Sequence, residues 1–249
     1  YDPIGGARFY GVGNEFMGIL VGAAVMSWAL FCQLYPQRPR LRALGGCLFF
    51  AAVLAVIGAP FLGTNVGGSI TAAAAFGFTW LLLEDRVNRR GLFALILLTA
   101  AVLGLFMFID SQKRAGEQSH IGQTVALFGR DGFPALKLII RRKLAMNLRL
   151  LRYSIWSKAL LVAAAVLAAS FIWPTSFIRW LMKNYPAVSQ GISGVVLGSL
   201  AAFIFNDSGV VAAATCLLFA STAILILALQ LKHDLGSAQP HVEDNAHSH

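Results

Sequence analysis

Three short stretches place polar and acidic residues beside long apolar runs. They are "GVGNEFMGIL" at 11–20, "GTNVGGSITA" at 63–72 and "FNDSGVVAAA" at 205–214. Each has an Asn near the start of an apolar run and a Gly a few residues later. Asn and Asp are favoured helix N-caps because their side chains accept bonds from free backbone N–H groups. Helix N-termini also carry partial positive charge, so three that converge would form an anion-binding site.

Two acids stand in this setting, Glu15 and Asp207. Acids inside transmembrane segments are rare and usually functional, so both are candidates for an ion relay or a general base. Arg8 could add a bidentate contact to a phosphate or carboxylate. The predicted ligand-binding residues are Arg8, Tyr10, Asn14, Glu15, Asn65, Asn206, Asp207 and Ser208. The competing interpretation is plain helix packing through small and polar residues, and for Asn65 alone it is the favoured one.

The composition indicates the environment of these stretches. Of the 249 residues, 57% are hydrophobic and only 12% are charged, and the mean hydropathy is +0.70. Soluble domains carry about 25% charged residues, so this is the composition of a membrane protein. The net charge of +9 fits anchoring at anionic lipid headgroups rather than binding of nucleic acid.

Seven windows have the length of about 20 apolar residues that a membrane-crossing helix needs. The predicted spans are about 14–35, 43–60, 66–83, 91–109, 157–174, 191–206 and 208–231. We therefore expect an all-α, polytopic transmembrane helix bundle over residues 1–231. Residues 232–249 are expected to form a disordered polar tail.

Seven crossings divide the connecting segments between two faces, here named side A and side B. Side A receives residue 1, "GTNVGG", "NDSG" and the long segment 110–156, whereas side B receives the short loops at 36–42 and 84–90, the segment 174–190 and the tail. The two short side-B loops carry six arginines, which by the positive-inside rule makes side B cytoplasmic. The long side-A segment also carries cations, namely Lys137, Arg141, Arg142, Lys143, Arg149 and Arg152, but long segments cross largely regardless of charge. We expect the C-terminal tail to be cytoplasmic.

The side-A segment "ALKLIIRRKLAMNLRLLRY" at 135–153 has the pattern of an amphipathic basic helix. At 100° per residue, one arc holds Lys137, Arg141, Arg142, Arg149 and Arg152, and Ile140, Leu144 and Leu151 lie on the other side. Such a helix suits the headgroup layer. Lipid anchoring is the favoured interpretation, and binding of the phosphate of a lipid-linked ligand is the alternative.

The motifs "RFYGVGNE" and "NDSG" resemble those of a group of uncharacterised bacterial multi-pass membrane proteins. The resemblance covers most of residues 6–231 and rests on the combination of motifs. It implies a bacterial inner-membrane protein and a longer parent chain, of which this sequence is the C-terminal membrane half. It would also make an upstream domain of the same chain a partner. It does not imply a reaction.

No motif for a nucleotide, a P-loop, a zinc site or a nucleophile elbow occurs, so no cofactor is predicted. The leading expectation is a protein that binds an anionic ligand, small or lipid-linked, on side A, most simply for transport or flipping. One alternative is a membrane-embedded transferase or hydrolase acting on a lipid-linked phosphate, with Glu15 or Asp207 as base. The other is a non-catalytic membrane anchor for the upstream domain.

Overall fold

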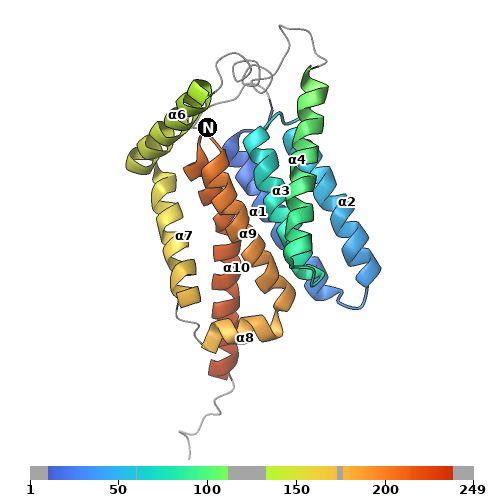
Figure 1. The fold of residues 1–249 in the computed structure, drawn as a ribbon. Helices are drawn as coiled ribbons and strands as arrows, with labels where there is room; N and C mark the ends of the chain where they lie inside the picture. The colour runs from blue at the N-terminus through green and yellow to red at the C-terminus, as the bar shows by residue number, and fades with distance from the viewer. Residues whose placement is uncertain (1–10, 60, 112–132, 173–175, 238–249) are drawn as a thin grey trace, which may run out of the picture.

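The computed structural model describes residues 11–59, 61–111, 133–172 and 176–237, which form α-helices and no β-strand (Figure 1). The helices in these ranges are α1 (Asn14–Leu34), α2 (Pro39–Gly58), α3 (Val66–Leu83), α4 (Arg89–Ser111), α6 (Phe133–Tyr153), α7 (Ile155–Ile172), α8 (Ser176–Asn184), α9 (Pro186–Phe205) and α10 (Gly209–Ser237). The prediction of an all-α fold is confirmed.

Six of these helices, α1, α2, α3, α4, α9 and α10, are long and apolar enough to cross a membrane. The second half of α6 and the helix α7 form a pair bent by 88°, which gives a seventh span if the pair is counted as one. The architecture is therefore that of a multi-pass membrane protein with six to seven spans. The span expected at 157–174 corresponds to α7 and qualifies only as part of this bent pair.

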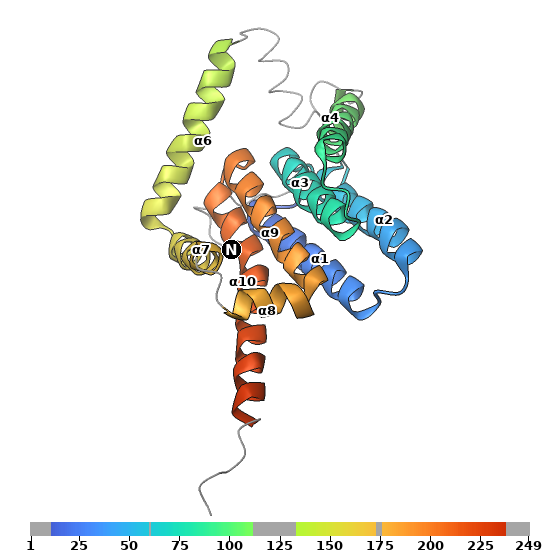
Figure 2. The same ribbon diagram turned by 60° about the horizontal axis from the view of Figure 1, so that its bottom comes forward.

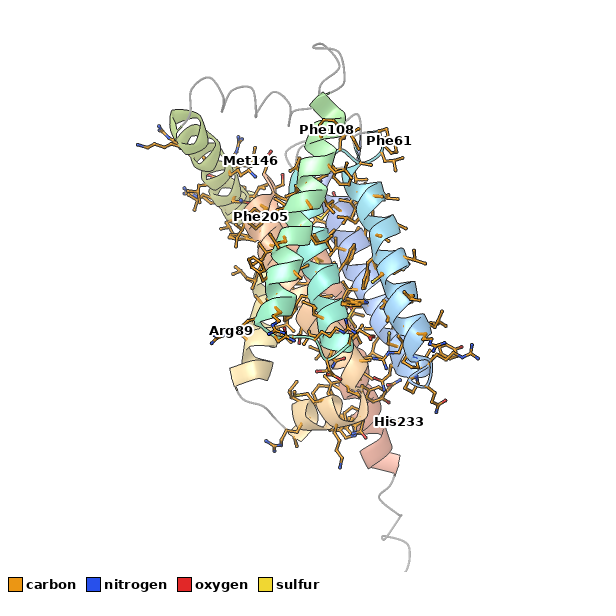
Figure 3. All side chains as sticks on the ribbon, turned by 45° about the vertical axis from the view of Figure 1, so that its right-hand side comes forward. Phe61, Arg89, Phe108, Met146, Phe205 and His233 are labelled. Atoms are coloured by element: carbon orange, nitrogen blue, oxygen red, sulfur yellow. The ribbon has the colours of Figure 1, made fainter. Side chains whose placement is uncertain are left out.

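The helices run alternately up and down between two ends (Figure 1). The starts of α1, α3 and α10 lie at one end, beside α6, and the turns after α1 and α3 lie at the other, beside α8. Figure 3 shows Phe61, Phe108, Met146 and Phe205 towards the first end, and Arg89 and His233 towards the second. These ends correspond to the predicted side A and side B, and the two names are kept for them below.

Small residues allow the central helices to pack closely. A side chain at Gly18 of α1 would collide with the Ala212 carbonyl and the Thr215 hydroxyl of α10. One at Gly194 of α9 would collide with Thr79 of α3. Helix association in a membrane depends on such close backbone approach, because lipid supplies no hydrophobic drive between apolar helices. α1, α3, α9 and α10 thus form the centre that positions the polar ends.

Two helices on side B begin before the predicted apolar windows, and both begin with proline. α2 begins at Pro39 rather than near 43, and α9 begins at Pro186 rather than near 191. Proline suits the first helical position, where its missing N–H would have no partner anyway. α9 is consequently a full 20 residues long and extends the apolar window predicted at 191–206 towards side B.

The segment 174–190 was placed on side B, with no secondary structure assigned to it. It contains α8, a nine-residue helix that lies crosswise beneath the bundle (Figure 2). Ile178 and Leu181 are buried, whereas Arg179 and Lys183 are exposed. α8 is amphipathic, with its apolar side against the bundle.

The basic helix expected near 135–153 is present as α6. It ends at an elbow around Ser154, where the Ser154 hydroxyl accepts a bond from the Trp156 N–H (3.2 Å). Across the elbow, the Ser157 hydroxyl donates to the Leu150 carbonyl (2.6 Å). These bonds satisfy backbone groups that the bend would otherwise leave open, so the sharp turn from α6 into α7 is built into the local sequence.

Candidate functional site

Asn65 joins the start of α3 to the start of α1. Its side-chain oxygen accepts the Gly68 N–H (2.8 Å), so Asn65 is the N-cap of α3, as predicted. Its amide nitrogen donates to the Val12 carbonyl (3.0 Å) and to the Asn14 side-chain oxygen (3.1 Å). Asn65 is 2% exposed. A buried amide with both its donor and its acceptor used is a structural tie, which agrees with the packing interpretation favoured for this residue.

Asn206 makes the corresponding tie between α9 and α3. Its amide nitrogen donates to the Ala202 carbonyl (3.0 Å) and to the Thr71 hydroxyl oxygen (3.1 Å). The Thr71 hydroxyl donates its own proton to the Gly67 carbonyl (2.8 Å), so it can only accept from Asn206. This arrangement fixes which way the Asn206 amide faces and holds the end of α9 against the first turns of α3.

The fixed orientation leaves the Asn206 side-chain oxygen facing Gly67. That oxygen is buried and has no hydrogen-bond partner in the part of the chain that the structure describes. A Cβ at Gly67 would lie 2.6 Å from it and 2.6 Å from the Phe205 carbonyl oxygen. The two backbones therefore meet without room for a side chain between them.

The start of α10 is held by a residue from a different helix. The Val210 N–H donates to the side-chain oxygen of Asn147 in α6 (3.2 Å), and Asn147 is 8% exposed. One turn along α6, Leu150 is buried against Val210 and Val211. α6 therefore docks on the turn between α9 and α10 through a polar cap and an apolar contact.

A lysine completes this docking from the same side of α6. The Lys143 ammonium donates to the Phe205 carbonyl (2.6 Å), the last residue of α9, and lies 3.8 Å from the Asp207 carboxylate. A cation at a helix C-terminus is favoured by the helix dipole. The side chains are 30% and 48% exposed, so the ion pair itself adds little stability. The half-exposed Asp207 carboxylate remains accessible from side A.

The remaining predicted site residues are Glu15, Ser208, Arg8 and Tyr10. Glu15 follows Asn14 in the first turn of α1 and is partly exposed, on the same end of the bundle as Asp207. Ser208 is buried, and its carbonyl accepts the N–H groups of Val211 and Ala212. Arg8 and Tyr10 lie outside the described residues. The structure thus brings Asn14, Asn65 and Asn206 into a network around the start of α3, while Asp207 lies beside Lys143 at its edge.

Two of the three expected helix caps were wrong. The N-cap of α1 is Gly13, and Asn14 is the first helical residue. Asn206 caps the C-terminus of α9 rather than the start of α10. The Gly68 and Val210 N–H groups that an anion would use already bond to Asn65 and Asn147. At α3 and α10, helix N-termini therefore contribute less to an anion site than the pattern indicated, and positive charge must come from side chains.

Lys143 and Asn147 were not predicted as site residues. The helical pattern of 135–153 does distinguish them. They lie four residues apart, on the side of the helix away from the arc of five cations described above. A Lys and an Asn on the remaining arc, followed by Leu150, mark the face that contacts another helix. The partner, however, lies more than 60 residues away in the chain.

Among the described residues, no group of three or more His, Cys, Asp or Glu side chains could hold a metal ion. No protein-family model, no curated protein and no solved structure matches this chain.

Proposed function

We propose that this chain is a bacterial inner-membrane protein that binds an anionic, lipid-linked ligand on side A and moves it across the membrane. The observation that carries the proposal is the contact of Lys143 with Phe205 and Asp207. It holds a basic helix against the turn between α9 and α10. A phosphate that reached this turn would meet an ammonium group, and a proton or cation would meet the carboxylate beside it.

The exposed surface of α6 supports a ligand with a lipid tail. Lys137, Arg141, Arg149 and Arg152 are exposed on this helix, and so are Leu144, Leu148 and Leu151. Cations and apolar side chains on one in-plane helix match the boundary between headgroups and acyl chains. A ligand with a phosphate head and a hydrocarbon tail would approach the turn along this boundary.

Transport is favoured over chemistry by what surrounds Asp207. Asp207 lies beside Lys143 and is half-exposed, so its carboxylate can exchange protons or cations with the bulk phase at the membrane surface. The sequence carries no recognised nucleophile–base motif that would make this carboxylate part of a catalytic pair. By the positive-inside rule, side B and the tail are cytoplasmic in this proposal, so side A faces outward.

The test is transport in proteoliposomes with a fluorescent polyprenyl phosphate as the probe and a fluorescent phosphatidylcholine as the neutral control. The wild-type protein should move the phosphate probe faster than empty vesicles do, and Asp207→Asn should slow it at least tenfold while remaining folded. Asn keeps the shape of Asp but not its charge. A wild-type rate equal to that of empty vesicles, or an unchanged rate in Asp207→Asn, contradicts the proposal.

A further inference from the structure

The opposite end of the bundle, side B, carries a dense set of cations that the proposed ligand site does not use. Among the described side chains at this end, nine are Lys or Arg and two, Glu84 and Asp85, are acidic. The nine cations are Arg38, Arg40, Arg42, Arg86, Arg89, Arg90, Arg179, Lys183 and Lys232. Arg42 is partly used internally, since it donates to the Leu83 carbonyl (2.7 Å). The other eight are exposed.

Aromatic side chains lie at the same level. In α8, the Trp180 ring lies 5.9 Å from Phe177 and 5.4 Å from Tyr185, measured between ring centres. At the end of α3, the Arg86 guanidinium lies 5.6 Å from the centre of the Trp80 ring. Trp and Tyr gather where a membrane protein passes through the headgroup layer. The cations and the aromatic rings are therefore two independent indications that this end of the bundle lies in the headgroup layer.

α8 gives this surface a defined geometry. It lies crosswise to the spans (Figure 2), with Ile178 and Leu181 buried. Its two cations, Arg179 and Lys183, are four residues apart and hence adjacent on one face. Gln33 fixes the end of the helix, because it donates to the Asn184 carbonyl (3.2 Å) and accepts the Ala187 N–H (3.0 Å). The two charges are thus held on a helix anchored to α1 and α9.

We infer that α8 and the neighbouring turns of side B form a binding surface for anionic phospholipid headgroups, with Arg179 and Lys183 contacting the phosphate. Each cation near an anionic membrane surface contributes a favourable electrostatic interaction, which corresponds to about fivefold in affinity for one charge and about 30-fold for two. The surface lies at the opposite end from the proposed transport site and does not depend on it. It predicts a preference for anionic over zwitterionic lipid in the leaflet at this end.

Trp180 provides a local probe for this surface. The protein in neutral detergent would be titrated with phosphatidylglycerol or phosphatidylcholine carrying brominated chains, which quench nearby tryptophans. The difference between the wild type and Trp180→Phe isolates the signal of Trp180, and Phe retains an aromatic ring at that position. Phosphatidylglycerol should quench Trp180 at concentrations at least tenfold lower than phosphatidylcholine does. The preference should fall sharply in 1 M salt, where the Debye length is about 3 Å.

The charge dependence is tested with Arg179→Gln/Lys183→Gln, and with Arg179→Lys/Lys183→Arg as the control that keeps both charges. The neutral variant should lose most of the preference, and the control should retain it. Lys183→Gln alone, at an exposed position, should weaken it about fivefold and serves if the double variant does not fold. Equal quenching by the two lipids in the wild type, or an unchanged preference in the neutral variants, overturns the inference.

Discussion

The close approach of α3 to the turn between α9 and α10 can be tested with a single methyl group. A Cβ at Gly67 would lie 2.6 Å from both the Asn206 side-chain oxygen and the Phe205 carbonyl oxygen. Ordinary contact between a carbon and its neighbours needs about 3.5 Å. Gly67→Ala must therefore push the start of α3 away by several tenths of an ångström. The Asn206–Thr71 hydrogen bond, now 3.1 Å, would lengthen with it.

The expected change in the free energy of unfolding is the balance of opposing contributions. Overpacking costs about 1–3 kcal/mol, and a weakened buried hydrogen bond adds about 0.5–1.5 kcal/mol. The higher helix propensity of Ala offsets at most about 1 kcal/mol of this loss, and less at the second residue of a helix. We expect Gly67→Ala to lower the free energy of unfolding by about 1–3 kcal/mol. Thermal unfolding in detergent and unfolding in increasing SDS would both measure it.

Gly104 in α4 provides the matched control. A Cβ there would meet nothing within 4 Å, so Gly104→Ala should leave stability unchanged or raise it by up to about 1 kcal/mol. The two substitutions add the same methyl group to helical glycines, but only Gly67→Ala should lower the free energy of unfolding. If Gly67→Ala were as stable as Gly104→Ala, the tight contact that organises side A would not exist.

Two further predictions concern the docking of α6 and the membrane topology. Asn147→Ala removes the cap of Val210 and should cost about 1 kcal/mol, whereas Asn147→Asp keeps an acceptor and should retain most of the stability. Equal losses in the two variants, measured by thermal unfolding, would contradict the cap. In a variant lacking the three native cysteines, Phe61→Cys and Val87→Cys should react with an impermeant thiol reagent from opposite sides of the membrane, because these exposed residues lie in the α2–α3 and α3–α4 turns, at the two ends of α3. Labelling of both from one side would contradict the alternating order of α1 to α4.

The membrane architecture could be predicted from the sequence because its signals are local. An apolar run of about 20 residues predicts a span by itself, and α6 showed its amphipathic pattern without reference to other helices. The cap at Asn65 was likewise local, because the Gly68 N–H that it binds lies three residues away. Where proline begins a helix, at Pro39 and Pro186, the helix extends beyond the apolar window, so the window alone does not give the helix start.

The site could be predicted only in part because its geometry depends on distant pairs. Asn206 bonds Thr71 across 135 residues, and Asn147 bonds Val210 across 63. No periodicity encodes which helix lies beside which, so the pattern of Asn before an apolar run suggested caps open to a ligand. In the structure, these Asn side chains make most of their hydrogen bonds to neighbouring helices instead.

The "NDSG" turn combines two kinds of polar residue, and exposure separates them. Asn206 and Ser208 are 2% and 4% exposed. Their amide and carbonyl groups hold α3, α9 and the first turn of α10 together. Helix packing accounts for both. Asp207, between them, has a side chain that is 48% exposed and an ion pair that contributes little to stability. A carboxylate inside the bilayer is costly and usually functional, and this cost falls towards the membrane surface. Packing therefore explains the residues on either side of Asp207 but leaves its charge unexplained, and that charge is the strongest reason to seek a function at this end of the bundle.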